Sequence, residues 1–206
     1  INLLENPAVL GVVINARDVT ERKEVERFDQ LQRDMAVALS GTTKLEEALQ
    51  VSLQGILAAT GMNSGGIYLV DEETGALDLV HHKGLSDTFL REVSHYDADD
   101  PAIKPIMAGE SIYSNYEILE PRIIGSGLEE DMKAVAIVPI RQEGRVIGCL
   151  NVASRDIEEV PPRSRNIIEI LARQMAQSIV HARLVSALRE SEERYRALVD
   201  LGGEVG

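Results

Sequence analysis

Two long apolar segments lie next to each other in KAVAIVPIRQEGRVIGCLNVAS, which spans residues 133–154. Only a short polar stretch containing QEGR separates them, and Gly144 within it is suited to a tight turn. Continuous apolar runs that are interrupted by one such turn are typical of paired strands. The pattern predicts a β-hairpin, the clearest in the chain, and any fold of this chain has to accommodate it.

Other segments predict the elements around this hairpin. A helix with Leu53 and Ile56 on its broad apolar face is expected first, and Gly61 is well placed to end it. A second hairpin should follow, with strands over GGIYLVD and ALDLVHHKG joined at the turn EETG. The last expected elements before the clearest hairpin are two short helices, with caps at Ser86 and Asp100, and a strand near residues 111–114.

Both ends of the chain predict long amphipathic helices. Residues 163–201 contain neither Gly nor Pro and follow the start signal PPRS, which predicts a helix. At about 1.5 Å per residue this helix is roughly 50 Å long, more than the body of a small domain, so its far end has to pack on something outside the core. A second helix is expected over residues 20–40. The apolar stripe of the C-terminal helix consists of Ile168, Leu171, Met175, Ile179, Ala182, Val185 and Leu188.

Charge and cysteine content restrict the partners and the compartment. The chain has 34 Asp plus Glu against 21 Lys plus Arg, a formal charge of -13, which repels phosphate backbones and anionic lipids. We therefore expect no nucleic-acid partner and no membrane insertion by this fragment. A single cysteine, Cys149, forms no intramolecular disulfide, and no apolar run approaches the ~20 residues that span a bilayer. These features indicate a cytoplasmic location.

The order of these elements and two long segments resemble the GAF domain family. LEEALQVSLQGILAATGMNSGGIYLVDEETGALDLVHHKGLS and KAVAIVPIRQEGRVIGCLNVAS look like the opening and closing halves of such a domain, and the resemblance covers residues 31–183. The resemblance implies an α+β fold with a central antiparallel sheet of about six strands. It also implies helices on one face of the sheet, a ligand pocket on the other, and long N- and C-terminal linker helices.

Short segments at the two ends resemble a second family, the PAS domains. GVVINARDVTERKEVE is similar to the last strand and exit of a PAS domain, and ESEERYRALVD is similar to the helix that opens another. The resulting expected organisation is the end of a PAS domain at 1–19, a linker helix at 20–40, a GAF domain at 41–183, and a signalling helix with the start of the next PAS domain at 184–206.

The order PAS, GAF, PAS is similar to the input half of sensor histidine kinases. It implies that the parent chain is a protein histidine kinase of a two-component phosphorelay, with the PAS domains and a kinase core as partners. The fragment itself is expected to be non-catalytic, because it contains no catalytic histidine box, no ATP-binding glycine motif and no recognisable nucleophile with its base. Two functions remain open: sensing a small ligand, or relaying a signal between the PAS domains through dimeric helices.

The GAF resemblance also implies where a ligand binds. The family's signature for cyclic nucleotides does not occur here, and the polar candidates are too few to name a ligand. The candidates for the pocket are Tyr68, His95, Tyr96, Asp97, Tyr113, Cys149 and Asn151.

Cys149 has two interpretations. Period-two alternation places it on one face of its strand together with Ile147 and Asn151, and the simpler interpretation is a small buried hydrophobic residue. The alternative is a haem- or redox-sensing GAF domain that uses Cys149 or His95. The bilin-binding pattern of the family is absent, so the main expectation is that no cofactor is bound, with haem as the alternative.

The histidines do not form a metal site in this interpretation. His81 and His82 are adjacent in a strand and point to opposite faces, so they cannot bind one metal together without a bulge. His95 is expected between two short helices, over the region where GAF ligands lie. No metal is therefore expected.

A parallel homodimer is expected, because a helix that projects from its domain leaves apolar side chains in water unless a partner covers them. Their burial contributes about 1.5–3 kcal/mol for each large side chain. Parallel packing follows from the flanking domains, since two kinase chains have to keep their output ends together. The residues expected at the interface are Phe28, Leu31, Met35, Met175, Ile179, Ala182 and Val185.

Overall fold

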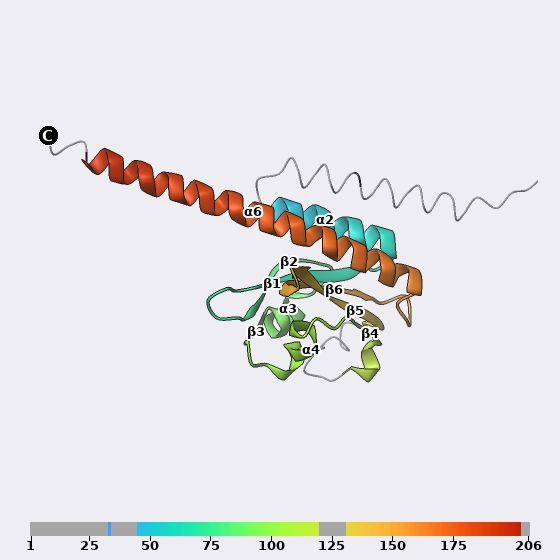
Figure 1. The fold of residues 1–206 in the computed structure, drawn as a ribbon. Coiled ribbons are helices and arrows are strands. Elements are labelled where there is room, and N and C mark those ends of the chain that lie inside the picture. Colours follow the sequence, from blue (N-terminus) through green and yellow to red (C-terminus); the bar gives the residue numbers. More distant parts are fainter. Residues whose placement is uncertain (1–32, 34–44, 120–130, 203–206) are drawn as a thin grey trace, which may run out of the picture.

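The computed structural model describes Arg33, residues 45–119 and residues 131–202 (Figure 1). Within these residues, six antiparallel strands form one sheet in the order β3-β2-β1-β6-β5-β4, which confirms the predicted α+β fold. The strands are β1 (Ser64–Val70), β2 (Leu77–Lys83), β3 (His95–Tyr96), β4 (Ile112–Asn115), β5 (Ala134–Gln142) and β6 (Arg145–Ser154). The helices are α2 (Leu45–Thr60), α3 (Asp87–Val93), α4 (Lys104–Met107) and α6 (Pro162–Gly202), with 3-10 turns η1 (Pro101–Ile103) and η2 (Tyr116–Ile118).

The β5–β6 hairpin lies in the middle of the sheet, as its sequence predicts. The two strands pair in antiparallel register up to Gln142 and Arg145. Glu143 and Gly144 close the loop with φ values of 50° and 83°. Positive φ at both residues of a two-residue loop is the geometry of a type I′ turn, whose twist matches that of the strands. The predicted second hairpin, β1–β2, is confirmed as well.

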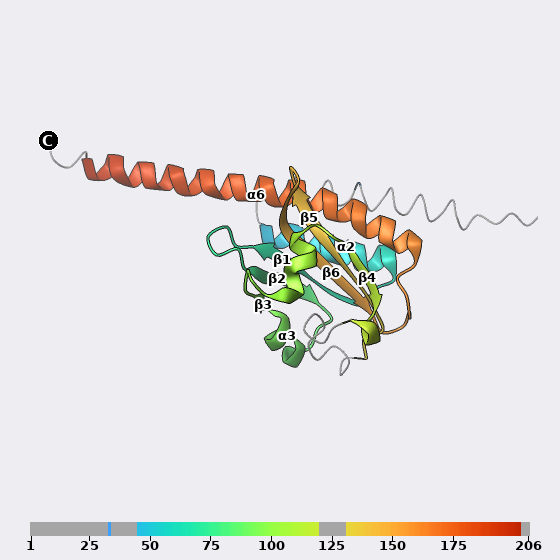
Figure 2. The same ribbon diagram turned by 60° about the horizontal axis from the view of Figure 1, so that its bottom comes forward.

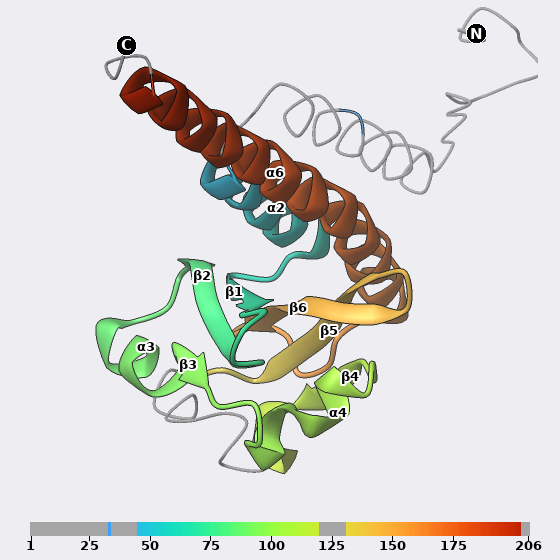
Figure 3. The same ribbon diagram turned by 60° about the vertical axis from the view of Figure 1, so that its left-hand side comes forward.

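Helices α2 and α6 cover one face of the sheet (Figures 1 and 3). Leu49, Leu53 and Ile56 recur at helical spacing on α2 and are buried in the core between the helices and the sheet. The helix ends at Gly61, where a φ of 72° lets its N–H donate to the Leu57 carbonyl over 3.0 Å. This end of the helix is the one that the sequence predicts.

Helix α6 covers the sheet with its first half and then continues beyond it. Ile168, Leu171, Met175 and Ile179 follow three-four spacing and are each at most 1% exposed. Over its 41 residues the helix is about 60 Å long, and Figures 1 and 2 show its C-terminal part extending away from the sheet. In the described ranges, no helix is both long enough and apolar enough to cross a membrane.

This packing corrects the predicted dimer interface on α6. Met175 and Ile179 belong to the core under the protein's own sheet, Ala182 is 7% exposed, and Val185 is partly buried. The apolar stripe begins where α6 crosses the sheet, so its first turns serve the domain itself and do not present a surface to a partner. The other predicted interface residues, Phe28, Leu31 and Met35, lie outside the described residues.

Short elements cover the opposite face of the sheet (Figure 3). Helix α3 begins at Ser86, whose hydroxyl accepts a hydrogen bond from the Phe89 N–H over 3.2 Å. The turn η1 begins at Asp100, whose carboxylate accepts from the Ala102 N–H over 2.8 Å. Both predicted caps are confirmed, and they position the walls of the site described next.

Candidate functional site

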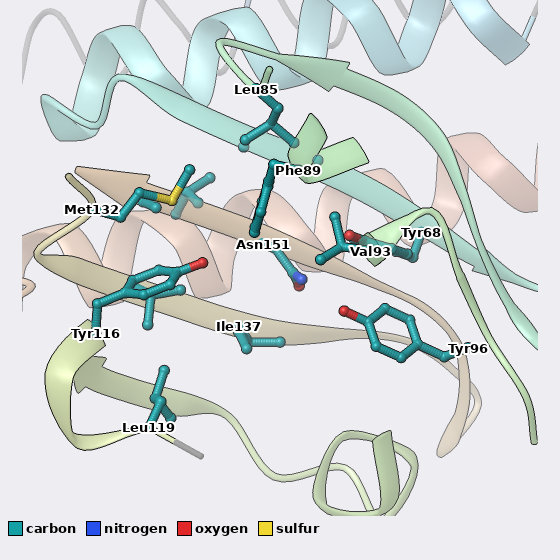
Figure 4. Close-up of a pocket in the computed structure, with 15 residues that line it drawn as sticks. Tyr68, Leu85, Phe89, Val93, Tyr96, Tyr116, Leu119, Met132, Ile137 and Asn151 are labelled. Atoms are coloured by element: carbon teal, nitrogen blue, oxygen red, sulfur yellow. The ribbon is translucent and has the colours of Figure 1, made fainter. Parts of the chain in front are cut away.

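A pocket lies between the sheet and the short elements on the face away from α2 and α6 (Figure 4). Its cavity has a volume of about 30 Å³, and a second cavity of about 20 Å³ shares Tyr96, Ile137 and Asn151 with it. Each therefore has room for about one water molecule. Most of the walls are aromatic or aliphatic; the labelled residues in Figure 4 are Tyr68, Leu85, Phe89, Val93, Tyr96, Tyr116, Leu119, Met132, Ile137 and Asn151.

Strand register brings four of the predicted pocket residues together. Cys149 and Asn151 are two residues apart on β6 and share one face, and Tyr68 of β1 lies directly opposite Cys149. Tyr96 comes from β3, which pairs with the start of β2. The ring centroids of Tyr68 and Tyr96 are 6.0 Å apart, with their planes tilted by 54°. These four residues line the two cavities.

The hydrogen-bonding groups of the pocket are only partly used. The Cys149 thiol donates to the side-chain oxygen of Asn151 over 3.4 Å. Within the part of the chain that the structure describes, neither the Tyr68 nor the Tyr96 hydroxyl has a hydrogen-bond partner, and the Asn151 amide nitrogen has none either. Figure 4 shows the Asn151 side chain and the Tyr96 hydroxyl directed toward the interior of the pocket. These groups are free to bind a ligand.

Burial keeps the pocket uncharged. It raises the pKa of the Tyr68 and Tyr96 hydroxyls and that of the Cys149 thiol, because a phenolate or thiolate there would lose its hydration. All three groups are therefore protonated at neutral pH, and a protonated thiol is a poor nucleophile. No charged side chain is among the described residues that line either cavity.

His95 and Asp97 lie at the surface, outside both cavities, which corrects their predicted place. The Nδ1 atom of His95 is 2.6 Å from Oδ1 of Asp78, and its Nε2 atom is 3.4 Å from Oδ1 of Asp97. The hydrogen bond to Asp78, followed by that to Asp97, raises the pKa of His95. His95 lies between α3 and α4, as predicted, but in the short strand β3, where Tyr96 points inward and its two neighbours point outward.

Tyr113 lies on the other face of the sheet, against α6, which corrects its predicted place in the pocket. Its hydroxyl donates to Oε1 of Glu169 over 2.8 Å, and the Ser111 hydroxyl donates to the same oxygen over 2.7 Å. The guanidinium of Arg165 lies 5.0 Å from the centroid of the Tyr113 ring. Burial, together with the hydrogen bond to Glu169, raises the pKa of Tyr113. Alternation along β4 turns its neighbour Ile112 toward the pocket side instead.

A bulge in β6 corrects the predicted alternation around Cys149. The register of the β5–β6 pair shifts between Ile140 and Arg141, which leaves Ile147 without a partner. The extra residue turns Ile147 to the other face, where it packs against the core under α6. Asn151 lies beyond the bulge and shares the pocket face with Cys149, as predicted.

His81 and His82 at the end of β2 line neither cavity. Burial lowers the pKa of His81, the charge of His82 lowers it further, and Glu46 of α2 opposes both. His81 pairs with Ile67 of β1, which belongs to the core under α2 and α6, so His81 faces α2 and not the pocket. Across residues 45–119 and 131–202, no group of three or more His, Cys, Asp or Glu is arranged to hold a metal ion.

The sequence analysis missed two aromatic residues of the pocket, Phe89 on α3 and Tyr116 at the start of η2. A signal for them was present, because the chain has only five Tyr and two Phe. Four of these, Tyr68, Phe89, Tyr96 and Tyr116, line the same cavity. In a chain with so few aromatic side chains, aromatic residues in segments without clear periodicity are candidates to line one common pocket.

Comparisons with known proteins agree with this geometry. The family model described as GAF domain matches residues 42–180. A domain of a protein assigned as a two-component sensor histidine kinase, from Sinorhizobium meliloti 1021, is 26% identical, with a TM-score of 0.59 over 71% of this chain and 97% of that one. The GAF domain of a phosphoenolpyruvate-protein phosphotransferase from Coxiella burnetii is 17% identical, with a TM-score of 0.67 over 82% and 99% of the two chains.

A third similar structure belongs to an enzyme. The free methionine-R-sulfoxide reductase from Neisseria meningitidis, solved with its substrate, is 17% identical, with a TM-score of 0.64 over 85% of this chain and 99% of that one. The search of curated proteins found no match. At such identities the reductase and the phosphotransferase domain show a shared fold, and function has to be argued from the site.

Proposed function

Because this chain belongs to the GAF domain family, we propose that it is a sensory module that binds a small molecule in the pocket facing away from α2 and α6. One observation carries the proposal: the pocket holds the Tyr68 and Tyr96 hydroxyls and the Asn151 amide nitrogen without partners in the described chain. These groups border the two cavities, where a ligand can replace water as their hydrogen-bond partner.

In this proposal, strand β4 transmits the effect of a ligand from the pocket to helix α6. Tyr116 in the pocket wall follows directly after β4, and Tyr113 and Ser111 bind one carboxylate oxygen of Glu169 on α6. A ligand that displaces Tyr116 therefore acts on the contact between β4 and α6. A coupling of about 1–3 kcal/mol is enough to bias two arrangements of a helix.

We assign the parent to the sensor histidine kinases of two-component systems, in which this module lies between two PAS domains. The similarity to the Sinorhizobium meliloti domain supports this assignment. So do the PAS-like segments over residues 11–26 and 190–200. Helix α6 runs without a break through residues 184–202, so the part of the chain assigned to signalling is a direct extension of the helix that covers the sheet.

The proposed parallel homodimer uses a different part of α6 from the one that the sequence suggested. Leu184, Leu188 and Tyr195 are 65%, 62% and 71% exposed and lie four and seven residues apart. This spacing places them on one face of the helix, as in the seam of a coiled coil. A second copy of the same helix is the partner that covers this face in our proposal.

A haem site built on Cys149 or His95 fits these residues poorly. The Cys149 thiol is buried and protonated, and it donates to Asn151. His95 is held at the surface by Asp78 and lines neither cavity. The two cavities of about 30 and 20 Å³ are also far smaller than a macrocycle requires. We therefore do not assign a haem- or redox-sensing function to this pair.

Thermal unfolding with a library of small metabolites tests the sensory function. We expect at least one compound to raise the unfolding temperature of the wild-type protein and to appear bound in native mass spectra. Ala153→Ile fills the cavity floor and should abolish both effects, because Ala153 is 5% exposed and lines the pocket. Asn151→Leu, which removes an amide without adding bulk, is the second variant in case Ala153→Ile does not fold.

A relay that binds nothing gives a different result. In that case no compound stabilises the wild-type protein, or the same compounds stabilise the wild type and both pocket variants equally. Either outcome would remove the sensory proposal and leave the helices as the functional part of the module.

A further inference from the structure

The described lining of the pocket carries no formal charge. It consists of glycines, aliphatic and aromatic side chains, and the amide of Asn151. Burial raises the pKa of Tyr96, and the nearby carboxylate of Asp100 raises it further. Oδ1 of Asp100 accepts from the Ala102 N–H at the start of η1, and Asp100 is not among the described residues that line either cavity. A ligand in the pocket therefore finds no counter-ion among these residues.

The neutral groups that are present favour an uncharged ligand. An ion that leaves water for an apolar cavity loses its hydration, and only a paired opposite charge or a set of strong hydrogen bonds compensates the loss. The Tyr68 hydroxyl and the Asn151 amide are neutral groups that cannot replace a counter-ion. A neutral molecule has no such penalty.

The hydrogen-bonding groups indicate which neutral atoms the ligand presents. The oxygen of Asn151 already accepts from Cys149, so the groups that remain are the amide N–H donors of Asn151 and the hydroxyls of Tyr68 and Tyr96. Each of these can donate, so an oxygen acceptor on the ligand satisfies them best. The rings of Tyr68, Phe89 and Tyr96 favour an aromatic body packed beside that oxygen.

We propose that this pocket selects an uncharged, ring-containing small molecule with an oxygen acceptor, such as an aromatic amide, and discriminates against its anionic and cationic isosteres. The inference rests on the proposed sensory function and gives its ligand a chemical class. Because each cavity has room for about one water, entry of such a ring requires side chains of the wall to move. The flexible side chain of Met132, which lines the pocket, is suited to this.

Three probes of nearly equal shape test the class: benzamide, benzoate and benzamidinium, which carry charges of zero, minus one and plus one. Their dissociation constants for the wild-type protein are measured by ligand-observed NMR at neutral pH. Fragments of this size bind at about millimolar concentrations. We expect benzamide to bind at least about tenfold more tightly than either ion, since the loss of ion hydration is not compensated.

Variants of the pocket residues test whether benzamide binds there. Asn151→Leu and Tyr96→Phe each remove a polar group from the pocket and should weaken benzamide binding, with about a tenfold loss for Asn151→Leu. Asn166→Leu makes the same change as Asn151→Leu at an exposed position of α6 and serves as the matched control, with unchanged binding expected.

The outcomes separate this inference from the sensory function. Benzoate or benzamidinium binding as tightly as benzamide, with the same loss in Asn151→Leu, overturns the ligand class and leaves the sensory function in place. Benzamide binding that is the same in Asn151→Leu, Tyr96→Phe and wild type places the probe elsewhere and overturns the assignment. If the three probes fail while a library compound binds and loses its effect in Ala153→Ile, the class is wrong; if no compound binds at all, both proposals fail.

Discussion

The two faces of the sheet differ in how they are covered. One face packs against two long helices, and its core contains aliphatic side chains such as Leu53, Ile67, Leu150 and Ile179, all with no exposed surface. The other face is covered by helices of four and seven residues and by turns, and it contains four aromatic side chains, the thiol and both small cavities. The same strands therefore serve a closely packed core and a pocket.

Alternation along each strand makes this division possible. On β5, Val138 contributes to the helix-covered core and Val135 to the pocket wall. One strand can therefore pack closely against the helices on one side, while on its other side it carries polar groups without hydrogen-bond partners in the described chain. This combination is common at functional sites. Stability and ligand binding can therefore be changed separately here, and variants on the two faces test this.

The largest effect is expected for a charge placed in the helix-covered core. Ile179→Glu should prevent folding, because an unpaired buried carboxylate costs more than about 4 kcal/mol, much of the stability of a typical domain. Leu188→Glu places the same group at a position of α6 that is 62% exposed and should leave the domain folded. Circular dichroism with light scattering measures both variants.

The same pair of variants tests the proposed dimer. Leu188→Glu should convert a dimer to a monomer, since it places like charges on the face that a second copy covers. An Ile179→Glu protein with native circular dichroism would contradict the assignment of this part of α6 to the domain's own core. A wild-type protein that is monomeric at high concentration would contradict the dimer.

A smaller effect distinguishes the two faces within one strand. Val138→Ala should lower the free energy of unfolding by about 2–3 kcal/mol, because it removes buried methyl groups and leaves a cavity in a closely packed core. Val135→Ala should cost about 1 kcal/mol, because this side chain already borders a cavity and has fewer neighbours to lose. Urea unfolding measures both values, and equal losses would remove the distinction between the faces.

The contact between β4 and α6 is expected to contribute less. Tyr113→Phe removes one of two hydroxyls that donate to Glu169 and should lower the free energy of unfolding by about 1 kcal/mol. In a double-mutant cycle, Tyr113→Phe and Glu169→Gln should be non-additive, because both remove the same hydrogen bond. Additive losses would show that β4 and α6 are not coupled through this contact.

The sequence predicted the fold better than the site. Periodicity identified both hairpins and the helix that ends at Gly61, because apolar spacing and turn residues are local signals. It could not show that Tyr113 faces α6, since the direction of a short edge strand is set by the neighbour with which it pairs. The sequence also could not show that Ile147 faces the helix-covered core, because the bulge arises from pairing with β5 and not from the residues of β6 alone.

The smallest predicted effect concerns His95 at the rim of the pocket face. Its pKa is raised in the folded protein by the hydrogen bonds to Asp78 and Asp97, so the protonated ring stabilises the fold. This contribution is fully present below the unfolded pKa of about 6.5 and is lost as the pH rises through the higher folded pKa. His95→Gln should therefore be less stable than wild type near pH 6, with a difference that shrinks as the pH rises. Because the side chain is exposed, solvent screening keeps the difference small.

Urea unfolding of wild type and His95→Gln from pH 5.5 upward measures this difference while the carboxylates remain ionised. The lowered pKa of His81 acts with the opposite sign but is present in both proteins, so it cancels in the comparison. Asp78→Asn should flatten the pH profile in the same way, because it removes the nearer partner at 2.6 Å. A difference that grows with pH would show that His95 stabilises the rim in its neutral form, and the contact with Asp78 would then be an ordinary hydrogen bond without a contribution from charge.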